Sequence, residues 1–356
     1  MKVLLIANYR PDGQESMQRF SALLERGLSE AGHEVRVCRP APIVGGASKL
    51  LGYVDKLALF PLTLGPALDW ADVIHICDHS NAMFVPRLRG RRHVVTCHDT
   101  LAIRSAAGDA PEHRTAWLGR QLQRMILAGL RRAQHVVCVS QATHREFVHR
   151  SGNSSATVIH NGLDYRWSPM PANDAAARIS SLGIPAERFL LHVGGNQWYK
   201  NRLGVLRIFA SVRRRANLRL VMAGKPWTRE MRNFVNRQGL SEDTIELTSV
   251  SDEDLRALYS AAALLLFPSL YEGFGWPIIE AQACGCPIVT SNRAPMDEIG
   301  GDGAAYADPE DAEAAAEIVL DALVRSAALR DAGFRNAKRF ATDEMISAYS
   351  NLYREL

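Results

Sequence analysis

Short apolar runs alternate with helical patterns along the first half of the chain. In the first run, KVLLIA (2–7), apolar residues are consecutive, which is typical of a strand buried on both faces of a parallel sheet. The helix after the first run has Phe20 and Leu24 at helical spacing, and we expect Ser16 to cap it and Gly32 to end it. The predicted strands are KVLLIA (2–7), EVRVC (34–38), DVIHIC (72–77), RHVVTC (92–97), QHVVCV (134–139) and ATVIHNG (156–162).

The second half repeats this alternation. Together the two series predict an α/β protein with two Rossmann-like β/α/β domains, each with a parallel sheet. We place the linker at residues 165–173, which contain two prolines. Ligands of such folds bind beyond the carboxyl ends of the strands, so the loops there are the candidate sites. The predicted strands are FLLHVGG (189–195), LRLVMAG (218–224), TIELTS (244–249), ALLLFPS (263–269) and PIVTSN (287–292).

Composition fits a globular protein. The chain has 356 residues, of which 47% are hydrophobic and 22% charged, and this excludes a disordered or disulfide-stapled protein. No apolar run approaches the about 20 residues of a membrane span, and the first residues do not form a signal peptide. We therefore expect a cytoplasmic protein. Four of its six cysteines, Cys38, Cys77, Cys97 and Cys138, lie in strand-like runs and should be buried thiols, and the spacing of Cys284 and Cys286 does not suit zinc.

Charge is uneven along the chain. Residues 1–165 carry 20 Lys and Arg against 14 Asp and Glu, whereas the remainder carries 22 against 24. A basic first half could face an anionic acceptor or the inner face of a membrane, or its four arginines between 87 and 92 could form a solvated turn. The leucine-rich segment 50–68 fits either an amphipathic helix at a membrane surface or a core-packing helix, and Pro61 and Pro66 limit its length.

The most informative segment is SLYEGFGWPIIEAQACGCPIVTSN (269–292), which predicts strand, glycine loop, helix and strand. Glycines allow the backbone to approach a ligand, and Pro277 suits the first helical position. Glu272 in the loop and Glu280 in the helix flank a helix N-terminus that favours an anion. Carboxylates accept hydrogen bonds from sugar or ribose hydroxyls. The alternative is a strand–helix unit whose carboxylate only stabilises the helix dipole.

This segment resembles the E-x7-E motif of the family 4 retaining glycosyltransferases, which have the GT-B fold. Three more segments resemble family motifs in the family's order: HNGLD (160–164), HVGGNQWYKN (192–201) and APMDEIGGDGAAYADP (294–309). The resemblance implies two Rossmann-like domains facing across a cleft. An acceptor domain would span residues 1–165 and a nucleotide-sugar donor domain residues 166–341. It also implies that the C-terminal helix, about 342–356, packs back on the first domain.

The resemblance assigns donor contacts in the second half. Glu280 would bind the ribose. Glu272 would bind the donor sugar together with the backbone of Gly273, Phe274 and Gly275. Lys200 would contact the diphosphate and stabilise the charge that builds on the leaving group. Backbone near Val250 would contact the base.

The chain departs from the family beside Lys200. The family has an arginine five residues before this lysine, where this chain has Gly195, and Tyr199 replaces the arginine of an Arg-Lys pair. Arg202 is a candidate for neutralising the phosphates, as is Lys225, which lies in AGKPW after a predicted strand. The alternatives are that Arg202 is a solvated helix residue and that Lys225 is an ordinary loop residue.

In the first half, His98 follows a predicted strand in VVTCHDT. By resemblance it positions the donor sugar at the reaction centre, and the alternative is a structural hydrogen bond. The resemblance places Gly13 beside the diphosphate, although it could be only a turn glycine. Asp99 shares the location of His98. The loop residues Asp78 and His79 follow another strand and could contact the acceptor.

The activity implied is metal-independent transfer of a hexose, with retention, from a nucleotide-diphosphate sugar to a hydroxyl. UDP- and GDP-linked donors fit best, and the acceptor would be a saccharide or lipid-linked saccharide. No cofactor, metal or nucleic acid is expected. Three alternatives remain: an epimerase-like enzyme, a dinucleotide oxidoreductase, and a binding protein that has lost catalysis. The oxidoreductase would need G-x-G-x-x-G after the first strand, and NYRPDGQES lacks it.

Overall fold

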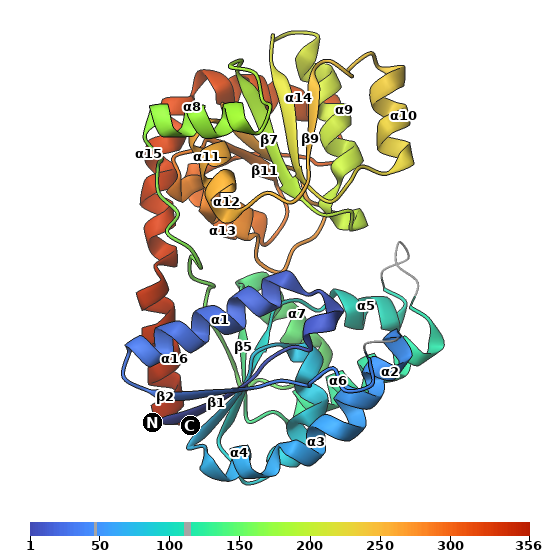
Figure 1. Cartoon of the computed structure of the whole chain (residues 1–356), viewed down its shortest axis with the longest axis vertical. Coiled ribbons are helices and arrows are strands. Elements are labelled where there is room, and N and C mark those ends of the chain that lie inside the picture. Colours follow the sequence, from blue (N-terminus) through green and yellow to red (C-terminus); the bar gives the residue numbers. More distant parts are fainter. Residues whose placement is uncertain (46–47, 110–114) are drawn as a thin grey trace. The chain divides into compact units, whose positions relative to one another are not determined.

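The computed structural model describes residues 1–45, 48–109 and 115–356, and it divides into two compact units (Figure 1). The first unit holds Met1–Asp164 and Thr342–Leu356, and the second holds Tyr165–Ala341. Each unit contains one six-stranded parallel sheet. The predicted α/β class with two Rossmann-like parts is therefore confirmed.

The sheet of the first unit has the order β2-β1-β3-β4-β5-β6. Its four central strands are almost fully buried, which explains their continuous apolar sequences. All six strands lie within the predicted runs. They are β1 (Lys2–Ile6), β2 (Glu34–Cys38), β3 (Val73–Ile76), β4 (His93–Cys97), β5 (His135–Cys138) and β6 (Ala156–Val158).

Helices flank this sheet, and the C-terminal helix α16 packs on α1. A side chain at Gly27 of α1 would collide with Ile346 of α16, so this glycine permits their close approach. The helices of the first unit are α1 (Glu15–Glu30), α2 (Lys49–Val54), α3 (Phe60–Thr63), α4 (Gly65–Trp70), α5 (Leu101–Ala107), α6 (Trp117–Arg132), α7 (Gln141–Ser151) and α16 (Thr342–Glu355). The unit also contains the 3-10 helices η1 (Arg10–Asp12) and η4 (His79–Leu88) and the π-helix η3 (Asp55–Leu59).

The sheet of the second unit has the order β12-β11-β10-β7-β8-β9. Its strands are β7 (Phe189–Gly194), β8 (Arg219–Gly224), β9 (Thr244–Leu247), β10 (Leu264–Phe267), β11 (Ile288–Ser291) and β12 (Ala305–Ala307). Its helices are α8 (Ala172–Ser181), α9 (Arg202–Arg213), α10 (Arg229–Arg237), α11 (Asp252–Ala261), α12 (Trp276–Ala283), α13 (Met296–Gly300), α14 (Ala312–Val324) and α15 (Ser326–Ala337), with short turns η5 (Trp198–Lys200), η6 (Gly301–Gly303) and η7 (Lys338–Phe340).

Serine side chains cap helices α7 and α11, whereas the cap expected at Ser16 is not formed. Ser140 caps α7, and Ser251 forms a capping box with Asp254 at α11. Ser16 does not cap α1, because that helix begins at Glu15 and Ser16 lies in its first turn. Strand β12 was missed because it has only three residues and lacks a long apolar run.

The leucine-rich segment 50–68 forms consecutive short helices rather than one long helix, as its prolines suggest. Phe60, Leu64 and Leu68 are buried in the core of the first unit, whereas Leu62 is 80% exposed. No helix in the described part of the chain is both long and apolar enough to span a bilayer.

Candidate functional site

The loop between β10 and α12 ends in a left-handed glycine at the start of the helix. Gly275 has φ 105° and occupies the N-cap of α12, a backbone region that favours glycine. Helix α12 begins at Trp276, so Pro277 is its second residue rather than its first. The Phe274 side chain is buried and packs edge-on against Phe340, which anchors the loop. The loop backbone therefore has a fixed course at the carboxyl edge of the sheet.

Two of the predicted donor residues meet directly. The Lys200 ammonium donates hydrogen bonds to both carboxylate oxygens of Glu272, with distances of 2.8 and 3.0 Å. Lys200 lies in η5 after β7, and Glu272 lies in the loop after β10. These strands are neighbours in the sheet. Both side chains are mostly buried, with 18% and 9% of their surfaces exposed.

The other predicted carboxylate, Glu280, is buried in the second unit. It lies in α12, is 3% exposed, and accepts a hydrogen bond of 2.9 Å from the Tyr259 hydroxyl of α11. Tyr259 is fully buried, and its pKa is raised far above the ordinary value, first by burial and then by the Glu280 charge. Sequence reasoning missed Tyr259, because a tyrosine on the apolar face of a helix has the pattern of a core residue.

Arg202 is buried rather than presented to solvent. Only 4% of its surface is exposed, and its guanidinium donates to the side chain of Asn196 and to the carbonyl of Lys225. These bonds connect the loops that follow β7 and β8. The arrangement therefore supports a structural role, whereas the phosphate contact stays a prediction. Lys225 itself lies exposed on its loop.

The remaining predicted donor positions lie in loops of the two units. Gly13 ends η1 with φ 64° and is exposed. Val250 lies just before α11 and follows Ser249, which has φ 59°. Gly195 is partly buried, and a side chain there would press on the amide of Gln197. An arginine at this position would therefore require the flexible end of the Gln197 side chain to move aside.

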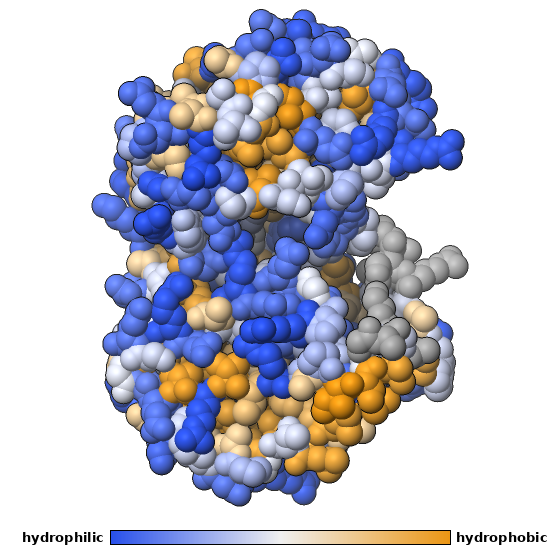
Figure 2. Space-filling model, in the orientation of Figure 1, coloured by the Kyte–Doolittle hydropathy of each residue, from blue (hydrophilic) through white to orange (hydrophobic). Residues whose placement is uncertain are grey.

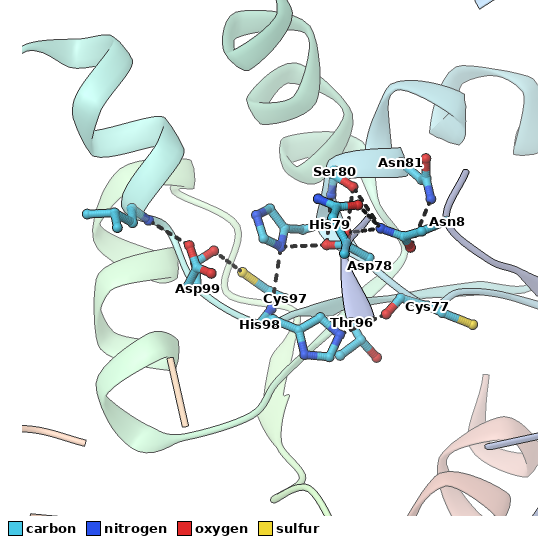
Figure 3. Close-up of polar contacts among 12 residues, drawn as sticks. Asn8, Cys77, Asp78, His79, Ser80, Asn81, Thr96, Cys97, His98 and Asp99 are labelled. Carbon is cyan, nitrogen blue, oxygen red and sulfur yellow. Dashed lines mark hydrogen bonds and ion pairs between the residues drawn. The ribbon is translucent and has the colours of Figure 1, made fainter. Parts of the chain in front are cut away.

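In the first unit, His98 follows β4 and is 5% exposed (Figure 3). Its Nε2 lies 2.9 Å from the carbonyl of Cys77, and since a carbonyl only accepts, Nε2 carries the proton. Burial lowers the pKa of His98, which favours the neutral ring. Phe20 packs edge-on against that ring at 4.6 Å. Nδ1 is then the nitrogen that can accept a proton.

Asp78 and His79 form a buried ion pair after β3 (Figure 3). Burial alone would lower the pKa of His79, but Asp78 at 3.0 Å raises it to about 10. Burial alone would raise the pKa of Asp78, but His79 and the Ser80 hydroxyl hold it well below its usual range. The backbone N–H of His98 also lies 3.4 Å from Nδ1 of His79. Because a protonated Nδ1 is itself a donor, its hydrogen bond goes to Asp78 at 3.0 Å and not to the His98 N–H.

The ion pair is tied to the loop after β1. Asn8 donates through its side-chain nitrogen to Asp78 and, at 2.6 Å, to Gln14, the neighbour of Gly13. Loops after β1, β3 and β4 thus share one buried polar network. Asp99 caps the turn into α5, since its carboxylate accepts from the N–H of Leu101 at 2.9 Å. No cluster of His, Cys, Asp or Glu suited to a metal occurs among the described residues.

Two family models match the chain in sequence. "Glycosyltransferase Family 4" matches residues 17–167, and "Glycosyl transferases group 1" matches residues 176–339. This chain belongs to the family 4 glycosyltransferases. The family identified from the E-x7-E segment is confirmed, and the matches reach well beyond that segment.

Relatives and solved structures agree with this family. The chain is 27% identical to the Escherichia coli O-antigen chain mannosyltransferase B over 297 residues, or 81% of this chain and 76% of that protein. It is 30% identical to the D-inositol 3-phosphate glycosyltransferase of Saccharomonospora viridis over 285 residues, or 74% of this chain and 64% of that protein. HepE from Anabaena, solved with UDP and glucose, has the same GT-B fold, with a TM-score of 0.77, 20% identity and full coverage of both chains.

Proposed function

We propose that this family 4 glycosyltransferase moves a hexose from a UDP- or GDP-linked sugar to a hydroxyl of a saccharide or lipid-linked saccharide, with retained configuration. The observation that carries the proposal is the placement of Lys200, Glu272 and Glu280 around the glycine loop at the start of α12. Cation, carboxylates and helix N-terminus are the groups that a diphosphate and sugar hydroxyls require.

Each group has a distinct task in this mechanism. Glu280 accepts hydrogen bonds from the ribose hydroxyls, and Glu272 holds hydroxyls of the donor sugar. Lys200 faces the diphosphate, where negative charge builds as the bond from the anomeric carbon to the phosphate oxygen breaks. The acceptor oxygen forms the new bond on the same face, and the departing phosphate oxygen takes the acceptor's proton. The neutral ring of His98 positions the transferred sugar.

The chemistry of the acceptor follows from the relatives only as a class. One relative is named as an O-antigen chain mannosyltransferase and another as a D-inositol 3-phosphate glycosyltransferase. The first name specifies an O-antigen chain and the second an inositol phosphate. They support a role in polysaccharide or glycoconjugate biosynthesis for this chain.

Product analysis separates a transferase from an epimerase-like enzyme. Incubation with donor and a saccharide acceptor should release one nucleoside diphosphate for each sugar transferred, and NMR should show the donor's anomeric configuration in the product. If nucleotide is released but no glycosidic product forms although the saccharide acceptor is present, the result would favour an epimerase-like activity instead.

We also propose that the first unit contacts an anionic membrane surface from the cytoplasmic side. Figure 2 shows hydrophobic side chains gathered over α2 and α3. The residues of the first unit include 21 Lys and Arg against 17 Asp and Glu, whereas those of the second balance at 21 each. A positive unit with exposed apolar side chains fits anionic lipid. The exposed side chains are Ile43, Val44, Leu51, Tyr53, Val54, Leu57 and Leu62.

Vesicle co-sedimentation tests this contact. Wild-type protein should bind vesicles that contain phosphatidylglycerol more than vesicles of phosphatidylcholine alone. Leu62→Asp should weaken binding, because Leu62 is 80% exposed, whereas Val324→Asp, at an 84% exposed site in the second unit, should not. Equal binding by both variants would contradict the proposed surface.

A further inference from the structure

The hydrogen bond between Tyr259 and Glu280 fixes a group that the proposed function uses. Tyr259 is fully buried in α11, and its hydroxyl lies 2.9 Å from Oε2 of Glu280. A buried phenol needs a partner, and a hydrogen bond to a charged acceptor is stronger than a neutral one. Since burial and the Glu280 charge raise the pKa of Tyr259, its hydroxyl keeps its proton and donates to this carboxylate.

The segment expected as the linker packs on the same tyrosine. Trp167 is 6% exposed, and its ring lies edge-on to Tyr259 with centroids 5.8 Å apart. The neighbouring Tyr165 donates to Glu253 of α11 at 2.7 Å, and its ring lies 5.2 Å from Trp167. The segment therefore lies against the helix that carries Tyr259.

A second set of bonds holds the segment from the α11 side. The Arg256 guanidinium donates to the carbonyl of Ser168 at 2.8 Å and to the carbonyl of Pro169 at 3.1 Å. Arg256 also pairs with Glu253 at 3.0 Å, the carboxylate that accepts from Tyr165. Residues 165–169 and α11 are thus joined by aromatic packing and by charge-assisted hydrogen bonds.

We propose that Tyr259 is a positioning residue that orients the Glu280 carboxylate toward the donor ribose, and that Trp167 holds Tyr259 in place. This inference rests on the proposed function. It adds that ribose affinity depends on the segment through which the chain enters the second unit. Tyr259 touches no reacting atom, so its removal should affect donor binding rather than the chemical step.

Tyr259→Phe tests the positioning role, because it keeps the packed ring and removes only the hydroxyl. The Kd for UDP or GDP, whichever the wild type binds, should rise about tenfold or more, as expected for a lost hydrogen bond to a charged group. The KM for the donor should rise in parallel, and kcat at saturating donor should stay within about threefold. Tyr306→Phe is the matched control, since its hydroxyl donates to the carbonyl of Gly301 at 2.6 Å rather than to a site carboxylate.

Two further measurements separate positioning from general destabilisation. The preference of the wild type for the nucleoside diphosphate over its 2′-deoxy analogue should shrink in Tyr259→Phe. In a Glu280→Gln background, Tyr259→Phe should cause little additional loss of affinity.

Trp167→Ala should weaken binding by about threefold through loss of packing, whereas Trp117→Ala, at a 63% exposed site, should not.

The outcomes are distinguishable. Wild-type nucleotide affinity and ribose preference in a folded Tyr259→Phe protein would overturn the positioning role and leave the proposed function intact. Equal losses in the wild-type and Glu280→Gln backgrounds would also overturn it. Failure of the wild type to bind any nucleoside diphosphate would overturn the proposed function, and the inference with it.

Discussion

Lys200 and Glu272 pair through both carboxylate oxygens, at 2.8 and 3.0 Å, although 72 positions separate them in the sequence. Lys200 also lies 5.4 Å from the centre of the Phe267 ring at the end of β10. The pair therefore joins the loops after two neighbouring strands of the second unit. A diphosphate that approaches Lys200 would compete with Glu272 for the ammonium and leave the carboxylate to sugar hydroxyls. The pairing thus keeps both groups mostly buried and in position.

Removal of the Lys200 charge should slow transfer. Lys200→Ala should lower kcat by about 10²- to 10³-fold, the usual cost of a lost electrostatic contact to the developing charge. Steady-state nucleotide release measures this effect. Lys338→Ala, which removes an exposed lysine of the same unit, should retain wild-type rates. Equal rates for wild type and Lys200→Ala would exclude the diphosphate role.

Arg202 should matter for stability. Its guanidinium is buried and joins Asn196 to the carbonyl of Lys225, so Arg202→Ala leaves these acceptors without their donor. We expect a loss of about 3 kcal/mol in the free energy of unfolding, measured with urea. Arg207→Ala, in the same helix, is the comparison. If Arg202→Ala unfolds like the wild type but loses diphosphate affinity, the phosphate role would be correct instead.

The Asp78–His79 pair should make stability depend on pH. The folded pKa of His79, about 10, exceeds its ordinary value of about 6.5. Its stabilisation is therefore fully present below pH of about 6.5 and is lost as the pH rises toward 10. Asp78→Asn should remove it, at a cost of about 3 kcal/mol. Urea unfolding between pH 6 and 10 should show the wild-type advantage shrinking, and a constant difference would contradict the ion pair.

Catalysis should not need a metal. Lys200, the α12 N-terminus and loop N–H groups supply positive potential where the phosphates are proposed to bind. Activity should therefore persist in EDTA after extensive dialysis. Activity that is lost in EDTA and restored by Mg²⁺ or Mn²⁺ would show that these groups do not suffice.

Most strands could be predicted from the sequence, because a strand buried on both faces is apolar at successive positions. Strand β12 could not, since Ala305–Ala307 has only three residues. The start of α1 was misplaced because Ser16 is a good capping residue in a position where the helix had already begun. The residue type indicates which side chains can cap a helix, but tertiary packing determines the turn in which the helix begins.

The residues of the candidate site could be predicted where a sequence motif specifies them. They could not be predicted where the packing of distant segments brings them together. Glu272 and Glu280 could be named from their spacing, but their direct partners could not. Lys200 meets Glu272 because β7 and β10 are neighbours in the sheet, a pairing that the order of the sequence does not reveal. Tyr259 has the pattern of a core residue, and Arg202 that of a solvated one, until their surroundings are known.

Calorimetric titration with a panel of nucleotide sugars, linked to UDP, GDP, ADP and dTDP, tests the central claim most directly. The claim is that the second unit holds a nucleotide-sugar site built on Glu280, Glu272 and Lys200. Wild-type protein should bind one class of donor at micromolar concentrations, and Glu280→Ala should weaken that binding severely while the protein stays folded. Binding that is unchanged in Glu280→Ala, or absent across the panel for folded wild type, would contradict the account.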